Sequence, residues 1–222
     1  MIIHELERLQ RSQYIDKVVL ATSTDSSDDP LVEIVEPLAD VYRGSLDDVL
    51  DRYYRCALNY NPMHIVRITG DCPVIDWRFV DKVIKKHLNE GNDYTSLTEH
   101  FPDGLDTEIF SFSTLERAWK EANLRAEREH VTLYIRRHSE KFKIGEYDSP
   151  EDFSAMRWTV DEPRDMEFIQ QIFAELYPKT KDFDMKDILK LLDDHPELKE
   201  INKGIQRNEG LQKSLKLDEL GG

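Results

Sequence analysis

The sequence lacks the features of a membrane, secreted or zinc-binding protein. No apolar run in its 222 residues reaches the roughly 18 needed to cross a membrane. Its first residues, M-I-I-H-E-L-E-R-L-Q-R, are amphipathic and charged, without the apolar core and small-residue cleavage site of a secretory signal. The two cysteines, Cys56 and Cys72, belong to no C-x-x-C pair or cysteine–histidine cluster that would indicate zinc. We therefore expect a cytoplasmic protein with no membrane partner.

Positive charge is also scarce. The chain has 30 Lys and Arg against 45 Asp and Glu, which gives a net charge of −15. Binding to a nucleic-acid backbone needs clustered cations, so we expect no nucleic-acid partner. A nucleotide remains compatible, because a metal ion and a few local amides can meet its charge. The two common glycine-rich phosphate loops, G-x-x-x-x-G-K-[ST] and G-x-G-x-x-G, are both absent.

The residues that are present predict one α/β domain over residues 1–222. Hydrophobic residues make up 39% and no internal repeat is visible, which is typical of a single domain with a sizeable core. Alternating strand and helix patterns predict a mostly parallel sheet with helices on both faces, and shorter strands in the middle predict a mixed-sheet segment. The expected strands are Lys17–Thr22, Asp40–Arg43, Met63–Ile68, Asp93–Leu97, Asp106–Phe112, Phe142–Tyr147 and Phe153–Val160. The expected helices are Ile2–Arg11, Leu31–Leu38, one capped by Ser45, Arg78–Leu88, Thr114–Ala122, Glu127–Arg137, Pro163–Leu176, Met185–Leu192 and Glu197–Lys203.

The end of the expected strand Met63–Ile68 is the most informative point in the chain. The strand stops at Thr69-Gly70, and a single carboxylate, Asp71, follows before Cys72-Pro73. In open α/β sheets, ligands bind outside the carboxyl ends of the strands. A carboxylate there is placed to hold Mg²⁺ against substrate phosphates. The alternative is that Asp71 only forms an Asx turn before the proline, and this segment alone favours neither.

A second carboxylate, Asp161, ends the expected strand M-R-W-T-V. Its spacing slightly favours a role as N-cap of the helix that begins at Pro163. If the two strands are neighbours, however, Asp71 and Asp161 converge. Two aspartates can then hold one Mg²⁺ against a triphosphate and orient its α-phosphate for attack. His130, in R-E-H-V-T, is expected to be a hydrogen-bonded helix residue rather than a ligand.

Six motifs follow one another along the chain. They are V-V-L-A-T-S, V-Y-R-G-S-L-D-D-V-L-D-R-Y, V-R-I-T-G-D-C-P-V-I-D, P-D-G-L-D-T-E-I-F-S-F-S-T-L-E-R-A-W, R-E-H-V-T-L-Y-I and T-V-D-E-P-R-D. Through this ordered set the chain resembles the cytidylyltransferases of the spore coat polysaccharide biosynthesis protein F type, relatives of the acylneuraminate cytidylyltransferases, from about Ile2 to Leu215. The resemblance implies a Rossmann-like nucleotidyltransferase fold, that of the nucleotide-diphospho-sugar transferases. It also implies attack of a sugar or sugar acid on the α-phosphate of CTP, which gives a CMP-sugar and pyrophosphate.

The resemblance also implies roles for individual residues. Asp71 and Asp161 match the two Mg²⁺ ligands. The positions that match the nucleotide side are Thr22, Ser23, Arg43, Gly44, Thr69 and Gly70. The positions that match the sugar side are Asp103, Gly104, Asp106 and Glu108. A plain turn is an equal alternative for Asp103-Gly104, and an exposed strand residue is the favoured alternative for Glu108.

One family feature is missing. Relatives open with a strand and a loop, Q-A-R-x-x-S-x-R-L-P-G-K, whose cations neutralise charge at the α-phosphate. Met1 falls where relatives are already in their first helix. We therefore expect a sheet without its first strand, with an unpaired edge and exposed apolar surface.

Three functional hypotheses follow. The first is a Mg²⁺-dependent cytidylyltransferase of surface polysaccharide biosynthesis. The second is a catalytically inactive or truncated form that acts as a partner subunit. The third is a glycosyltransferase of related fold, ranked last because Asp106-Thr107-Glu108 only loosely matches a D-x-D metal motif. We expect a homodimer, because relatives commonly pair through their middle strands and an incomplete sheet must cover its edge.

Overall fold

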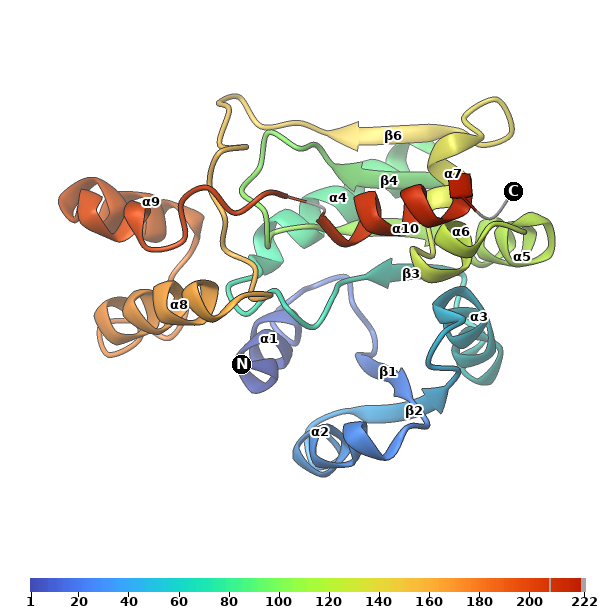
Figure 1. Ribbon diagram of the computed structural model, residues 1–222, viewed down its shortest axis with the longest axis horizontal. Helices are drawn as coiled ribbons and strands as arrows, with labels where there is room; N and C mark the ends of the chain where they lie inside the picture. The colour runs from blue at the N-terminus through green and yellow to red at the C-terminus, as the bar shows by residue number, and fades with distance from the viewer. Residues whose placement is uncertain (208, 221–222) are drawn as a thin grey trace.

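The computed structural model describes residues 1–207 and 209–220, which form two sheets surrounded by helices (Figure 1). The smaller sheet pairs β1 (Val19–Ser23) in parallel with β2 (Asp40–Gly44). The larger sheet has the order β3-β5-β4-β6. Strand β5 is antiparallel to both neighbours, and β4 is parallel to β6, so the expected mixed α/β fold is confirmed. The bounds of the larger sheet's strands are His64–Arg67 (β3), Tyr94–Leu97 (β4), Glu108–Ser111 (β5) and Ile144–Tyr147 (β6).

The two sheets are separated where a strand was expected to be missing. Within residues 1–207 and 209–220, β1 pairs only with β2, and β3 pairs only with β5. Figure 1 shows the β1–β2 pair apart from the edge of the larger sheet. Both β1 and β3 therefore have one edge without a strand neighbour, as expected.

The helices agree with the apolar periodicity, with small shifts at their ends. Helix α3 is capped by Asp48 rather than by Ser45, because the Asp48 carboxylate accepts from the amide of Asp51 at 2.9 Å. The Ser45 hydroxyl instead accepts from the amide of Asp48. None of the described helices has the length and apolar character needed to cross a bilayer. The helix bounds are Ile2–Leu9 (α1), Asp29–Val35 (α2), Val49–Tyr60 (α3), Trp77–Glu90 (α4), Phe112–Glu121 (α5), Arg125–Glu129 (α6), Leu133–Arg137 (α7), Pro163–Leu176 (α8), Met185–Asp194 (α9) and Glu209–Leu220 (α10), with 3-10 turns at Ser26–Asp28 (η1) and Pro196–Glu200 (η2).

The expected strand Phe153–Val160 is wrong. Its backbone amides bind several loops instead of one neighbouring strand. The amide of Trp158 donates to the carbonyl of Asp103 at 2.6 Å, and that of Val160 donates to the carbonyl of Asp71 at 2.9 Å. A single bridge between Asp103 and Arg157 is the only ladder contact found for this segment in the described chain. The segment therefore joins the loops that carry the candidate site residues.

Two helical expectations also need correction, and one helix was not expected. The expected helix Glu127–Arg137 is broken at Val131, whose φ of +40° lies in the left-handed region that a β-branched residue rarely adopts. The expected helix Glu197–Lys203 is replaced by η2. Helix α10 was not expected, since Gly210 in its first turn lowers the helix propensity of that segment.

The core anchors the loops that follow the strands. Cys72 and Ile75 are buried in the cluster beneath α4, directly after Asp71. Phe101 and Leu105 are buried in the cluster under α8 and α9, on either side of Asp103. The loops after β3 and β4 are therefore fixed by packing while their carboxylates stay outside the core.

Candidate functional site

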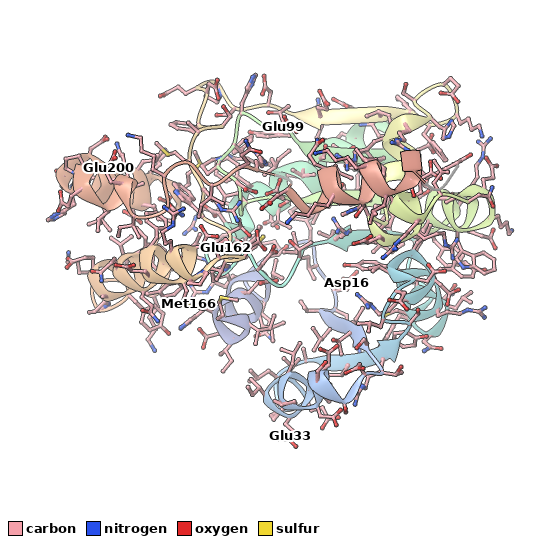
Figure 2. The ribbon with its side chains drawn as sticks, viewed as in Figure 1. Asp16, Glu33, Glu99, Glu162, Met166 and Glu200 are labelled. Carbon is pink, nitrogen blue, oxygen red and sulfur yellow. The ribbon has the colours of Figure 1, made fainter. Side chains whose placement is uncertain are left out.

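Six of the residues selected from the sequence line one pocket of about 500 Å³. The pocket lies beyond the carboxyl ends of β3 and β4 and is bordered by the α6–α7 turn and the segment around α10. Figure 2 labels two further lining residues, Glu99 and Glu162. The six selected residues are Thr69, Asp71, Asp103, Asp106, Glu108 and Asp161.

Asp71 and Asp161 converge, as expected for neighbouring chain segments. The carbonyl of Asp71 accepts from the amide of Val160 at 2.9 Å and from the hydroxyl of Thr159 at 3.3 Å. The two carboxylates are close enough for the charge of Asp71 to act on Asp161. Burial raises the pKa of Asp161, and the charge of Asp71 adds to that rise against a hydrogen bond from Arg157. A pair of carboxylates therefore occupies this end of the pocket.

The alternatives for these two aspartates are not observed. In the described part of the chain, no backbone amide donates to the Asp71 carboxylate, whose neighbour is the Cys72 thiol at 3.5 Å, so no Asx turn forms. The N-cap of α8 is Glu162 rather than Asp161. The amides of Asp161 and Glu162 both donate to Oδ2 of Asp165, at 3.2 and 3.0 Å.

The carboxylate pair suits a magnesium ion. Mg²⁺ is usually held by one or two carboxylates together with substrate phosphates and water. Over residues 1–207 and 209–220, no group of three or more His, Cys, Asp or Glu side chains is placed to form a complete protein cage. Two adjacent aspartates at a pocket wall therefore fit Mg²⁺ better than a closed structural metal site.

Arg157 connects this end of the pocket to Asp103, one of the residues expected on the sugar side. Its side chain is only 9% exposed and donates to Asp103 at 2.8 Å, Asp161 at 2.7 Å and Asp165 at 3.0 Å. The buried Asp165 also accepts from the side-chain Nδ2 of Asn202 at 2.9 Å. One guanidinium thus orients a candidate metal ligand and a candidate sugar-binding carboxylate.

The Asp103-Gly104 turn is shaped by close packing. Gly104 has a φ of +100°, and a Cβ there would lie 2.4 Å from the amide nitrogen of Thr159. Its amide donates to Oδ2 of Asp106 at 2.9 Å, and Arg207 donates to Oδ1 at 2.7 Å. Burial, followed by the charge of Asp106, raises the pKa of Asp103 to about 6. The segment is a turn, and it presents both carboxylates to the pocket.

Glu108 is buried rather than exposed, so its favoured alternative is wrong. Its Oε2 accepts from Arg67 at 2.6 Å. Its Oε1 accepts from the hydroxyls of Tyr94 at 2.5 Å and Thr132 at 2.7 Å. Burial raises the pKa of Glu108, but the charges of Arg67 and then Arg136 outweigh that effect and lower it. Glu108 is therefore an ionised carboxylate at the base of the pocket.

The residues expected on the nucleotide side do not gather in this pocket. The hydroxyls of Thr22 and Ser23 both donate to Asp28 at 2.6 Å. Arg43 donates to the carbonyl of Ser23 at 2.8 Å and pairs with Asp29 at 2.7 Å. Together with Gly44, these residues order the loop after β1, at the end of the smaller sheet. Thr69 lines the pocket, whereas the neighbouring Gly70 lies near Ile2 of α1.

One residue beside Asp71 could not be selected from the sequence. Glu5 on α1 is 4% exposed, and its Oε2 is buried with no partner in the described chain. Burial, followed by the charge of Asp71, raises the pKa of Glu5 from 4.5 to about 8. A long-range contact of this kind leaves no trace in the helical pattern of residues 2–9.

Glu5→Gln is expected to remove a pH-dependent loss of stability. The pKa of Glu5 is raised in the folded state. The contribution of Glu5 to the free energy of unfolding is therefore fully present below about pH 4.5 and is lost as the pH rises through about 8. Glutamine cannot ionise, so the variant should be more stable than the parent at pH 9 by about 2 kcal/mol, with little gain at pH 4. Urea denaturation across that range measures it. Glu7→Gln, exposed on the same helix, is the control, and equal pH profiles for all three proteins would contradict the assignment.

Comparison with known proteins gives a consistent result. Residues 1–206 match the family described as cytidylyltransferase. An uncharacterized protein of Methanocaldococcus jannaschii is 36% identical over 207 residues, which cover 91% of this chain and 83% of that protein. The spore coat polysaccharide biosynthesis protein SpsF of Bacillus subtilis is 32% identical over 186 residues, covering 82% and 77%. A solved cytidylyltransferase from Leptospira borgpetersenii has 32% identity and a TM-score of 0.85, covering 92% and 87%.

Proposed function

This chain belongs to the cytidylyltransferase family, and from that premise we propose that it transfers CMP from CTP to a sugar or sugar acid. The observation that carries the proposal is the meeting of Asp71 and Asp161 in one pocket with Asp103 and Asp106. A carboxylate pair suited to a cation thus lies beside carboxylates suited to sugar hydroxyls.

The proposed reaction joins the acceptor oxygen to the α-phosphorus of CTP and breaks the bond to the β-phosphate, which releases pyrophosphate. Asp71 and Asp161 would hold Mg²⁺, which when bound offsets phosphate charge and orients the α-phosphate. Asp103 and Asp106 accept hydrogen bonds from the acceptor. The pKa of about 6 for Asp103 suits a carboxylate that takes the proton of the attacking hydroxyl near neutral pH.

The similarity to SpsF supports a place in surface polysaccharide biosynthesis. We also propose a cytoplasmic location, where CTP is available, which cell fractionation tests. A homodimer remains part of the proposal, since β1 and β3 each have an edge without a strand partner in the described residues. Light scattering on the purified protein measures the oligomeric state, and a monomer at all concentrations would contradict the dimer.

Isothermal titration calorimetry with CTP tests the function. We expect CTP to bind with Mg²⁺ present and at least about tenfold more weakly with EDTA, because the metal offsets repulsion between phosphates and the two aspartates. ATP is the control for base choice. No CTP binding under either condition would overturn the proposal and favour a non-catalytic partner subunit. Preferential binding of an intact nucleotide sugar would favour a glycosyltransferase.

A further inference from the structure

One cation of the pocket has no partner of its own. Arg136 lies in the last turn of α7, is exposed and lines the pocket. Among the residues that the structure describes, it makes no ion pair or side-chain hydrogen bond. The other pocket arginines and the lysine are all paired with carboxylates: Arg67, Arg157, Arg207 and Lys213. Arg136 is thus a charge that the chain itself does not neutralise.

The neighbouring carboxylate, Glu108, is bound by other donors. Glu108 already accepts from Arg67 through Oε2 and from Tyr94 and Thr132 through Oε1. Arg136 is close enough for its charge to act on Glu108, but the two do not form an ion pair. The guanidinium donors of Arg136 therefore remain free for another acceptor.

The turn before α7 sets the direction of this side chain. Thr132 is the N-cap of α7, and its hydroxyl donates to the buried Glu108 at 2.7 Å. Residues four apart lie on the same side of a helix, so Arg136 follows Thr132 towards the pocket. Val131, with its positive φ, makes the break that allows a new helix to start here.

The pocket is therefore acidic at one end and cationic at the other. Asp71 and Asp161 form the acidic end, and Arg136, beside Glu108, forms the cationic end. The two ends are connected through β3, because Glu108 pairs with Arg67, four positions before Asp71. Resting on the function proposed above, we propose that Arg136 binds an anionic group of the acceptor, a carboxylate or a phosphate, away from the reacting hydroxyl. A planar guanidinium with free donors matches either anion in a bidentate geometry.

The adjacent Arg137 supplies a matched control. Cations in the last turn of a helix are also favoured simply by the helix dipole, which would account for both arginines. Arg137, however, is not among the pocket-lining residues and pairs with Glu127 at 3.7 Å. A recognition role predicts that the two arginines differ in ligand binding, whereas a dipole role predicts that they do not.

Direct binding without CTP or Mg²⁺ tests the inference. Glucuronate, glucose 6-phosphate and neutral glucose are titrated by NMR into the parent, Arg136→Gln and Arg137→Gln. We expect at least one anionic sugar to bind the parent about tenfold more tightly than glucose, as for a charged hydrogen bond, and the stronger of the two identifies the anion. Arg136→Gln should remove this preference, while Arg137→Gln should change it by no more than about twofold.

Two outcomes would overturn the inference: no preference of the parent for either anion, or an equal effect of the two substitutions. Thermal melts of both variants check folding, and exposed sites of this kind tolerate substitution. Because CTP is omitted, a failure of CTP binding would overturn the proposed function without altering this result. An Arg136-dependent preference without CTP binding would indicate an anionic-sugar binding protein.

Discussion

Asp71→Asn is expected to weaken Mg²⁺-dependent CTP binding by about 100-fold, because it removes one of two carboxylates available to the cation. The melting temperature should change little. Asp71 makes no backbone hydrogen bond with its carboxylate in the described chain, and the charge it loses repels that of Asp161. Calorimetry with CTP, at fixed Mg²⁺ and then in EDTA, measures the effect.

Asp47→Asn is the matched control, since Asp47 is exposed and lies in the loop before α3. It should bind CTP as the parent does in both conditions. A variant of Asp71 that melts far below the parent yet keeps its affinity for CTP would assign this residue a structural role. An equal loss in both variants would mean that overall charge, rather than the carboxylate pair, controls binding.

Gly104→Ala is expected to destabilise the fold by about 4 kcal/mol or more. The added Cβ would lie 2.4 Å from the amide nitrogen of Thr159 and 2.5 Å from the carbonyl carbon of Trp158, and φ is +100°. Both contacts are with backbone, so no side-chain rotation relieves them, and combined strain and overpacking give losses of this size. Urea denaturation measures the free energy of unfolding.

Gly91→Ala separates the two causes. Gly91 has a φ of +61° at the end of α4, but no atom lies within 4 Å of its added Cβ. Only the backbone cost applies there, so the expected loss is about 1 kcal/mol. Equal losses in the two variants would show that the close approach of the Gly104 turn to residues 158–159 does not exist in solution.

The elements that could be predicted from the sequence are those with regular side-chain patterns. Helix α8 has the expected bounds, because its proline start and apolar spacing are local. The meeting of Asp71 and Asp161 was expected only on the condition that their strands are neighbours, and from the family resemblance. Phe153–Val160 has a strand-like pattern, yet its amides bind separate loops. Side-chain composition does not report which backbone groups will be neighbours.

Among the site residues, too, local patterns could be predicted from the sequence, whereas long-range partners could not. Hydroxyls at strand ends are equally suited to a ligand or to a local cap. Here the hydroxyls of both Thr22 and Ser23 donate to Asp28. Glu5 and Arg157 were missed, because each is defined by partners far away in the chain, 54 positions in the case of Arg157 and Asp103. The motifs predicted six of the residues that line the pocket. Which charged side chains in the pocket form ion pairs could be seen only in the folded structure.

The shared guanidinium of Arg157 has a thermodynamic consequence. Asp161 and Asp103 both accept hydrogen bonds from Arg157. A ligand that breaks the bond between Asp161 and Arg157 therefore changes the proton affinity and hydrogen-bonding strength of Asp103. If a cation bound at Asp161 changes the affinity for an acceptor at Asp103 by some factor, linkage requires that the acceptor change the affinity for the cation by the same factor. Occupancy at one end of the pocket and occupancy at the other are therefore reciprocal quantities, and a double-mutant cycle on the two aspartates measures their coupling.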